Sequence, residues 1–205
     1  MSYEKEYQEK LTTAEAVAGM IESGMVIKLG YFTAKPVTLI QELAKRHDEL
    51  KDILIVACST APPIPEVIQY GETFTWWDWH WSKLTRALRP YFSNIVYGPI
   101  AYHMCCEFVR DQTVNQGRQT DWVWQQVGPM DENGYFNFGP TISESITSFE
   151  VAKYKCVEVN KNMPRCLGGS QESVHISMID YIVEAPDDQM IFAAPDVPAP
   201  TEVEI

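Results

Sequence analysis

Residues 25–59, MVIKLGYFTAKPVTLIQELAKRHDELKDILIVACS, contain two apolar runs with a helical run between them. MVIKLGYF (25–32) and DILIVACS (52–59) are predicted strands, and TAKPVTLIQELAKRHDEL (33–50) has the apolar spacing of a helix. Pro36 falls in the first turn of that helix, where no intrahelical N–H bond is lost. Strand, helix and strand in this order are typical of a βαβ unit, so we predict a parallel sheet.

Segments on either side extend the same alternation. Two more helices are predicted, TTAEAVAGMIES (12–23) behind a capping threonine and SESITSFEVAKY (143–154). Three more strands are predicted at 121–129, 155–164 and 174–185, and DENGYFNFG (131–139) is a predicted turn that leads into an extended segment. We therefore expect an α/β domain over residues 1–185, with an open, largely parallel sheet and helices on both faces. Residues 186–205, rich in proline, suit a linker or tail that leads toward a missing C-terminal domain.

The middle of the chain has no clean period. FTWWDWHWSKLTRALRPYF (74–92) contains four tryptophans within six positions, and YGPIAYHMCCEFVRD (97–111) fits a strand or a helix. A hairpin or a lid over a site is one interpretation of the tryptophan-rich stretch. The favoured interpretation is that these aromatic side chains fill an irregular core or a subunit interface.

Composition excludes several classes of protein. The 205 residues are 45% hydrophobic and 12% aromatic, which suits one ordinary globular domain. A net charge of −12 argues against nucleic acid as a partner, and an anionic ligand would need local cations or helix N-termini. The five cysteines form no CxxC pair and the four histidines are scattered, so we expect reduced thiols and no metal site. Without a signal-like or membrane-spanning run, the expected location is the cytoplasm.

Four phrases in sequence order resemble one known family. They are YQEKLTTAEAVAGMIESGMVIKLG (7–30), GPMDENGYFNFGPTIS (128–143), KYKCVEVNKNMPRCLGG (153–169) and ESVHISMIDYIVE (172–184). Together they resemble the N-terminal half of the acetyl-CoA hydrolase/transferase family, which includes butyryl-CoA:acetate and 4-hydroxybutyrate CoA-transferases. The resemblance covers nearly the whole chain.

The resemblance implies exchange of CoA between a short-chain acyl-CoA and a carboxylate acceptor. In the family a glutamate attacks the thioester, an acyl-glutamyl anhydride forms, and CoA then gives a glutamyl-CoA thioester. That glutamate follows a GIGxxP-type loop in the second half of the family, and this sequence contains no such loop. We therefore expect no catalytic residue here and no cofactor, since coenzyme A is a substrate. The expected partners are a C-terminal half or subunit that supplies the glutamate, and further copies of the chain in a homo-oligomer.

Candidate binding residues lie where predicted strands end, since ligands of parallel sheets bind at the carboxyl ends of the strands. CSTAPP (58–63) matches the family position at which a serine faces the substrate carboxylate, which nominates Ser59 with Thr60. WSKLTRAL (81–88) matches a segment that nominates Thr85 and Arg86. The third loop is GYFTAKP (30–36), where Gly30 permits close backbone approach and helix amides lie beyond. Its candidates are Gly30, Phe32 and Thr33.

Other interpretations stay open at this point. Ser59 fits a turn-stabilising hydroxyl as well as a ligand contact, and Arg86 fits a surface ion pair. Glutamates such as Glu144 and Glu158 are interpreted as structural or solvent-facing carboxylates. The alternative functions are a noncatalytic acyl-CoA-binding or assembly domain, and an acyl-CoA hydrolase that uses Ser59 or Cys58.

Overall fold

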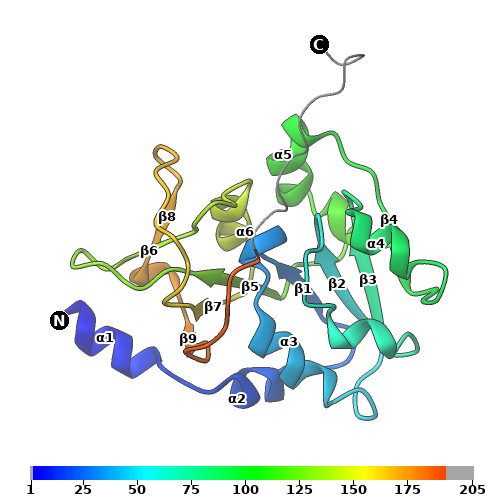
Figure 1. Ribbon diagram of the computed structural model, residues 1–205, viewed down its shortest axis with the longest axis horizontal. Coiled ribbons are helices and arrows are strands. Elements are labelled where there is room, and N and C mark those ends of the chain that lie inside the picture. Colours follow the sequence, from blue (N-terminus) through cyan, green and yellow to red (C-terminus); the bar gives the residue numbers. More distant parts are fainter. Residues whose placement is uncertain (1, 193–205) are drawn as a thin grey trace.

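A parallel sheet organises the protein, whose computed structural model describes residues 2–192. In that range seven strands pair in the order β4-β3-β2-β1-β5-β7-β9, all parallel, and β6 and β8 form a separate antiparallel pair (Figure 1). The strands are β1 Val26–Leu29, β2 Ile53–Ala57, β3 Phe74–Asp78, β4 Ile95–Tyr97, β5 Trp122–Val127, β6 Tyr135–Asn137, β7 Tyr154–Val159, β8 Ser173–His175 and β9 Tyr181–Glu184.

The chain reverses its direction of sheet growth at β1. Strands β2, β3 and β4 add successively on one side of β1, whereas β5, β7 and β9 add on the other side. Such a reversal opens a crevice at the carboxyl ends of the central strands, because the loops there diverge to opposite sides. The topology therefore predicts a ligand site at the loops that follow the central strands.

Helices cover both faces of the sheet. They are α1 Tyr3–Lys10, α2 Ala14–Gly19, α3 Val37–Ala44, α4 Lys83–Leu88, α5 Cys105–Arg110 and α6 Ser145–Val151, with short 3-10 helices at Phe32–Ala34, Glu66–Gln69, Tyr102–Met104, Thr113–Asn115 and Ile176–Met178. Alternate residues of β1 show the two faces: Ile27 and Leu29 belong to a core cluster with α2 and α3, while Val26 packs with Val109 of α5. The expected α/β fold with an open parallel sheet is confirmed.

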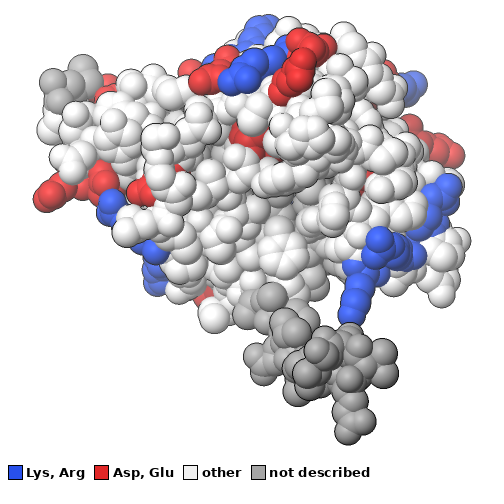
Figure 2. All heavy atoms as spheres, turned by 90° about the horizontal axis from the view of Figure 1, so that it is seen from above, with Lys and Arg blue, Asp and Glu red and all other residues white. Residues whose placement is uncertain are grey.

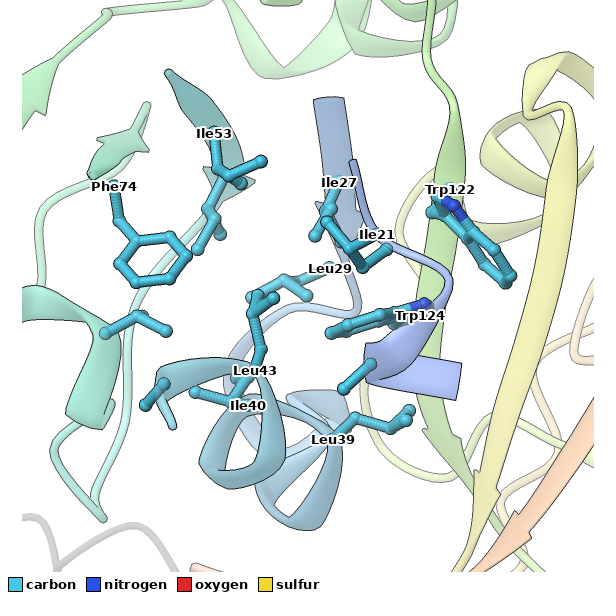
Figure 3. Close-up of a cluster of buried hydrophobic side chains, with 14 of the residues drawn as sticks. Ile21, Ile27, Leu29, Leu39, Ile40, Leu43, Ile53, Phe74, Trp122 and Trp124 are labelled. Atoms are coloured by element: carbon cyan, nitrogen blue, oxygen red, sulfur yellow. The ribbon is translucent and has the colours of Figure 1, made fainter. Parts of the chain in front are cut away.

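The largest core cluster lies between the sheet and the helices α2 and α3. Leu39, Ile40 and Leu43 of α3 point toward the strands, and the indoles of Trp122 and Trp124 complete the packing (Figure 3). Apolar side chains three and four positions apart in α3 form the stripe that packs on the sheet. This packing fixes α3 and, with it, the loop that connects β1 to α3.

The tryptophan-rich stretch is neither a hairpin nor a lid. It forms β3, paired in parallel with β2 and β4, followed by α4. Trp76 and Trp79 are only 1% and 3% exposed, so they fill the core of this chain. Because both faces of β3 are apolar in sequence, the two-residue period that marks a strand was hidden. Self-association through this stretch stays a prediction.

One other expectation needs correction, and one choice that was left open is decided. The single strand predicted at 174–185 is β8, a 3-10 turn and β9, and these two strands lie in different sheets. The stretch at 97–111 begins at the end of β4 and continues into a 3-10 turn and α5. Helix α1, which had not been predicted, begins behind Ser2, whose hydroxyl accepts a hydrogen bond from Lys5 N.

The expected linker or tail is only partly described. The side chain of Gln189 donates to Gln126 Oε1 at 2.6 Å and to Glu158 Oε1 at 2.9 Å, both of which belong to sheet strands. Residues 193–205 lie outside the described residues. Across 2–192, no helix combines the length and the apolar character that crossing a membrane requires.

Candidate functional site

A cleft of about 450 Å³ opens at the carboxyl ends of β1, β2 and β3. Tyr31 and Phe32 follow β1, Ser59 follows β2, and His80 follows β3, and all four line the cleft. Thr141, from the loop before α6, lines it as well. The cleft therefore lies at the edge of the sheet that the strand pattern predicted, and its volume falls in the range of small-molecule sites.

Three of the six non-glycine residues with positive φ in the described part of the chain line this cleft. Phe32, Ser59 and Ser143 have φ values of 47°, 49° and 44°, and each of the three lines the cleft. For residues with a Cβ this left-handed region costs about 1–3 kcal/mol each, and it persists only where the surroundings fix it. Such outliers cluster at functional sites, so their arrangement around one cleft marks it as the candidate site.

Asp78, at the end of β3, organises the loop that contains Ser59. It is fully buried, and its Oδ1 accepts hydrogen bonds from the backbone N–H groups of Ser59 at 3.1 Å and His80 at 3.2 Å. Its Oδ2 accepts from the hydroxyls of Thr60 at 2.7 Å and Thr85 at 2.9 Å. A carboxylate with these donors ties the loops after β2 and β3 to α4.

The candidates nominated from CSTAPP and WSKLTRAL therefore lie in three different environments. Ser59 is partly exposed and lines the cleft, and its Oγ lies 3.8 Å from Cys58 Sγ. Thr60 and Thr85 are buried, and their hydroxyls point to Asp78. Arg86 is exposed on α4 and is not among the described residues that line the cleft.

The third candidate loop is built by close packing. A Cβ on Gly30 would lie 2.3 Å from the carbonyl oxygen of Ala34, so the tight turn after β1 requires glycine. Thr33 is buried, and its hydroxyl lies 2.8 Å from that of Thr141. Of the three candidates from this loop, Phe32 lines the cleft. Gly30 and Thr33 instead make the contacts that hold the loop in its conformation.

The amides at the start of α3 already have a partner. The N–H groups of Val37 and Leu39 donate to the two carboxylate oxygens of Glu158 in β7, each at 3.0 Å. Glu158 is fully buried, and burial raises its pKa although these hydrogen bonds oppose the rise. These helix amides therefore bind a carboxylate of this chain, as expected for a structural Glu158.

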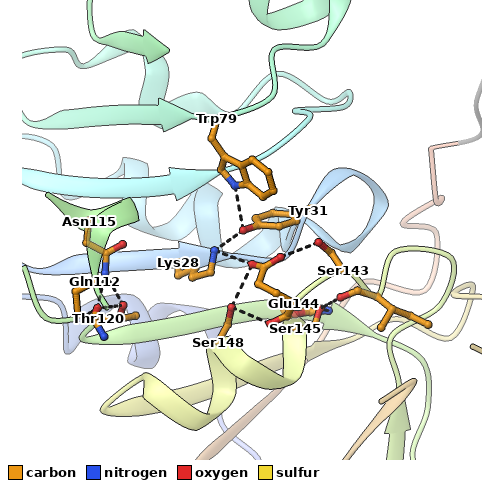
Figure 4. A network of polar contacts seen from close by, with 12 residues as sticks. Lys28, Tyr31, Trp79, Gln112, Asn115, Thr120, Ser143, Glu144, Ser145 and Ser148 are labelled. Atoms are coloured by element: carbon orange, nitrogen blue, oxygen red, sulfur yellow. Dashed lines mark hydrogen bonds and ion pairs between the residues drawn. The ribbon is translucent and has the colours of Figure 1, made fainter. Parts of the chain in front are cut away.

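A buried ion pair lies behind the cleft. Lys28 Nζ is 2.8 Å from Glu144 Oε1 with both side chains almost completely buried, and Lys28 also donates to the phenol oxygen of Tyr31 (Figure 4). Burial opposes ionisation of Glu144, but the Lys28 ammonium and hydrogen bonds from its neighbours lower the carboxyl pKa. Glu144 is thus a structural carboxylate whose charge is balanced inside the protein.

The nearby thiol is a poor nucleophile. Burial raises the pKa of Cys58 to about 12, so at neutral pH it is almost entirely the thiol form. Within residues 2–192, no three His, Cys, Asp or Glu side chains gather closely enough to hold a metal ion. Figure 2 shows a face whose middle is largely uncharged, with basic and acidic side chains toward its rim. With no Asp, Glu, Lys or Arg among the described residues that line it, the cleft suits binding of an apolar group better than nucleophilic attack.

Comparison with known proteins identifies the family. Residues 1–194 match the acetyl-CoA hydrolase/transferase N-terminal domain. The chain belongs to the acetyl-CoA hydrolase/transferase family. A butyryl-CoA:acetate CoA-transferase of Anaerostipes caccae is 41% identical over 187 residues, which are 90% of this chain and 41% of that protein. A probable butyrate:acetyl-CoA coenzyme A-transferase of Syntrophomonas wolfei is 33% identical over 201 residues, 97% of this chain and 44% of that protein.

A solved structure shows the same fold over nearly the whole of this chain. RipA from Yersinia pestis superimposes with a TM-score of 0.84 at 27% identity, covering 97% of this chain and 47% of RipA. This member of the acetyl-CoA hydrolase/transferase family therefore spans less than half the length of the relatives it matches.

Of the residues nominated from the sequence, Ser59 and Phe32 line the cleft of this family member, and both stand at the ends of predicted strands. The sequence did not nominate Asp78, His80 or the cleft-lining Trp81, since the tryptophan-rich stretch was not assigned as a strand. Assigning DWHW (78–81) to the end of a third parallel strand would have placed these residues at the ligand edge.

Proposed function

We propose that this chain is the N-terminal half of a CoA-transferase that exchanges CoA between a short-chain acyl-CoA and a carboxylate. The reaction passes through a glutamyl-CoA intermediate whose glutamate lies outside residues 1–205. The proposal draws on family membership and on relatives that are named as butyryl-CoA:acetate and butyrate:acetyl-CoA transferases. Coenzyme A and short-chain carboxylates would be the ligands, with no further cofactor.

One observation above all supports a missing nucleophile. No Asp or Glu is among the described residues lining the cleft, and the two carboxylates behind it are already engaged. Asp78 accepts hydrogen bonds from two loops and α4, and Glu144 is paired with Lys28. Neither could attack a thioester without leaving its buried donors unpaired, which would be costly.

The cleft would instead form a wall around the acyl group. Tyr31, Phe32 and Trp81 give it aromatic surface, and Ser59 offers a hydroxyl whose described contact is the weak one to Cys58. An apolar wall with few polar groups suits a short acyl chain, and a closed site is needed so that water does not intercept the anhydride. A second half or partner subunit would supply the glutamate and the remaining wall.

Chemical trapping tests this proposal directly. The chain is purified alone and also together with the C-terminal half of a family relative, and both samples receive butyryl-CoA and acetate. Borohydride then reduces a glutamyl thioester to an alcohol, and peptide mass spectrometry locates the modified residue. We expect turnover only in the combined sample, with the reduced glutamate in the added half.

The controls separate the competing functions. Turnover by the chain alone, or a reduced glutamate within residues 1–205, would contradict the proposal. Hydrolysis of butyryl-CoA by the chain alone, lost in Ser59→Ala, would favour the hydrolase. Binding of butyryl-CoA without turnover in either sample would favour a noncatalytic domain. Sedimentation of the same samples tests the expected homo-oligomer, which a monomer at high concentration would exclude.

A further inference from the structure

The buried ion pair is an unusual element at the centre of this sheet. Lys28 is an interior residue of the central strand β1 and is 0% exposed, and Glu144 is 3% exposed. Removing two charges from water is costly, and apolar residues of similar size often stabilise a fold as well as a buried pair does. The pair therefore calls for a role other than the stability of the sheet.

Each partner of the ion pair contacts a different wall of the cleft. Lys28 donates to the phenol oxygen of Tyr31, which follows β1. Glu144 Oε2 accepts from the Ser143 hydroxyl at 2.7 Å, and Ser143 is one of the cleft residues with positive φ. Tyr31 and Ser143 both line the cleft, so one ion pair holds two of its walls.

A third wall is connected through Trp79. The indole N–H of Trp79 donates to the Tyr31 phenol oxygen at 3.0 Å, as Figure 4 shows. The Trp79 ring in turn stacks on Tyr102, with ring centroids 6.0 Å apart and planes 26° apart. Tyr102 is 62% exposed and lines the cleft from the segment before α5. The network thus joins loops from three separate parts of the chain.

We propose that Lys28 and Glu144 are positioning residues, whose ion pair sets the relative placement of the Tyr31, Ser143 and Tyr102 walls of the cleft. This inference rests on the proposed function for what the cleft binds, but the positioning itself concerns this chain alone. It explains why a costly pair lies beneath a site of strained backbone. It also assigns both residues an effect on substrate binding without contact with substrate.

The test replaces the pair as a unit, because removing one partner would leave a buried charge and could prevent folding. Lys28→Met/Glu144→Leu substitutes apolar side chains of similar size. Lys28→Met/Glu144→Gln is the rescue variant, since its amide oxygen can still accept from the Ser143 hydroxyl. Lys10→Met/Glu6→Leu removes the 2.6 Å ion pair of α1, away from the cleft, as the matched control.

Amide hydrogen exchange reports positioning in the isolated chain. Phe32, Ala34 and Ser145 donate backbone hydrogen bonds within the cleft loops, whereas Val157 lies in β7. In the Met/Leu variant we expect exchange at the three loop amides to accelerate about tenfold or more, equal to about 1.4 kcal/mol of local opening free energy. Exchange at Val157 should change little, the Met/Gln variant should recover protection at Ser145, and the α1 control should resemble the parent.

Enzyme kinetics then test whether the placement of these walls affects binding of the carboxylate. With the C-terminal half added, the Met/Leu variant should raise KM for the carboxylate more than it lowers kcat. Unchanged loop exchange in that variant, or equal acceleration at Val157, would overturn the proposal, because the pair would then be inert or only globally stabilising. Absence of turnover in the parent would refute the proposed function instead, and the exchange data would still decide whether the pair positions the cleft.

Discussion

Removal of the Ser59 hydroxyl should lower activity and leave stability nearly unchanged, whereas removal of the neighbouring Thr60 hydroxyl should lower stability. Ser59 Oγ has only a 3.8 Å contact with Cys58 Sγ and faces the cleft, so Ser59→Ala should change the free energy of unfolding by less than about 0.5 kcal/mol. If its hydroxyl donates to a substrate carboxylate, the lost charge-assisted bond is worth about 1.5–3 kcal/mol. That loss corresponds to about a 10-fold to 150-fold lower kcat/KM for the carboxylate.

Thr60→Ala is the matched comparison. Its hydroxyl donates to Asp78 Oδ2 at 2.7 Å and accepts from the Trp76 indole at 3.1 Å, and both partners are buried. Losing one charged and one neutral hydrogen bond should cost about 2–4 kcal/mol of unfolding free energy. Ser59→Gly adds a third arm, since relief of the positive φ should stabilise the fold by about 1 kcal/mol.

Two measurements on the three variants decide the issue. Urea unfolding followed by tryptophan fluorescence gives stability, and carboxylate kinetics with the C-terminal half added give function. Equal destabilisation by Ser59→Ala and Thr60→Ala would show that both hydroxyls are turn-stabilising. Unchanged carboxylate kinetics in Ser59→Ala would remove Ser59 from the substrate-binding residues.

Three further predictions concern packing and ionisation around the site. Gly30→Ala places a Cβ 2.3 Å from a backbone carbonyl oxygen, so it should lower the free energy of unfolding in urea by about 1–3 kcal/mol. Gly19→Ala is the control, because a Cβ there meets open space and should not destabilise the fold. Equal effects of the two substitutions would refute this. Burial lowers the pKa of Lys35 to about 7, so between about pH 7 and 10 this residue binds more protons in the unfolded chain, and its contribution to stability should rise with pH. Urea unfolding at several pH values should therefore show the stability of the parent rising relative to that of Lys35→Met across this window, and parallel profiles would contradict it. Since burial raises the pKa of Cys58 to about 12, its thiol should react with Ellman's reagent much more slowly at pH 8 than that of the partly exposed Cys166, and comparable rates would count against this.

Sequence patterns predicted those helices and strands whose burial is visible in the order of their own apolar residues. The βαβ unit at 25–59 could be predicted because its strands are apolar throughout and α3 has a single apolar stripe. The late strand at 174–185 could not be divided correctly, since β8 pairs with β6 and β9 pairs with β7. Those partners lie elsewhere in the chain, and pairing across such distances leaves no local signal.

The residues of the candidate site likewise include some that the sequence could predict and some that depend on distant parts of the chain. Strand ends predicted Ser59 and Phe32, but the strand-end rule cannot tell which of Ser59 and Thr60 faces the cleft. That choice depends on Asp78, a buried acceptor from another strand. Glu144 likewise looked like an ordinary structural carboxylate until its ion pair with Lys28 placed it behind the cleft.

The position of Lys28 also bears on the order in which the chain folds during synthesis. The first four strands of the sheet lie side by side, so a nascent chain that has emerged as far as β4 already has the pieces of half a sheet. Its central strand, however, presents an ammonium group on the face that α5 and α6 later cover. Glu144 is synthesised long after Lys28, and until it arrives the charge must stay hydrated. We therefore expect this face of the half-sheet to close only once the segment that also completes the cleft has been synthesised.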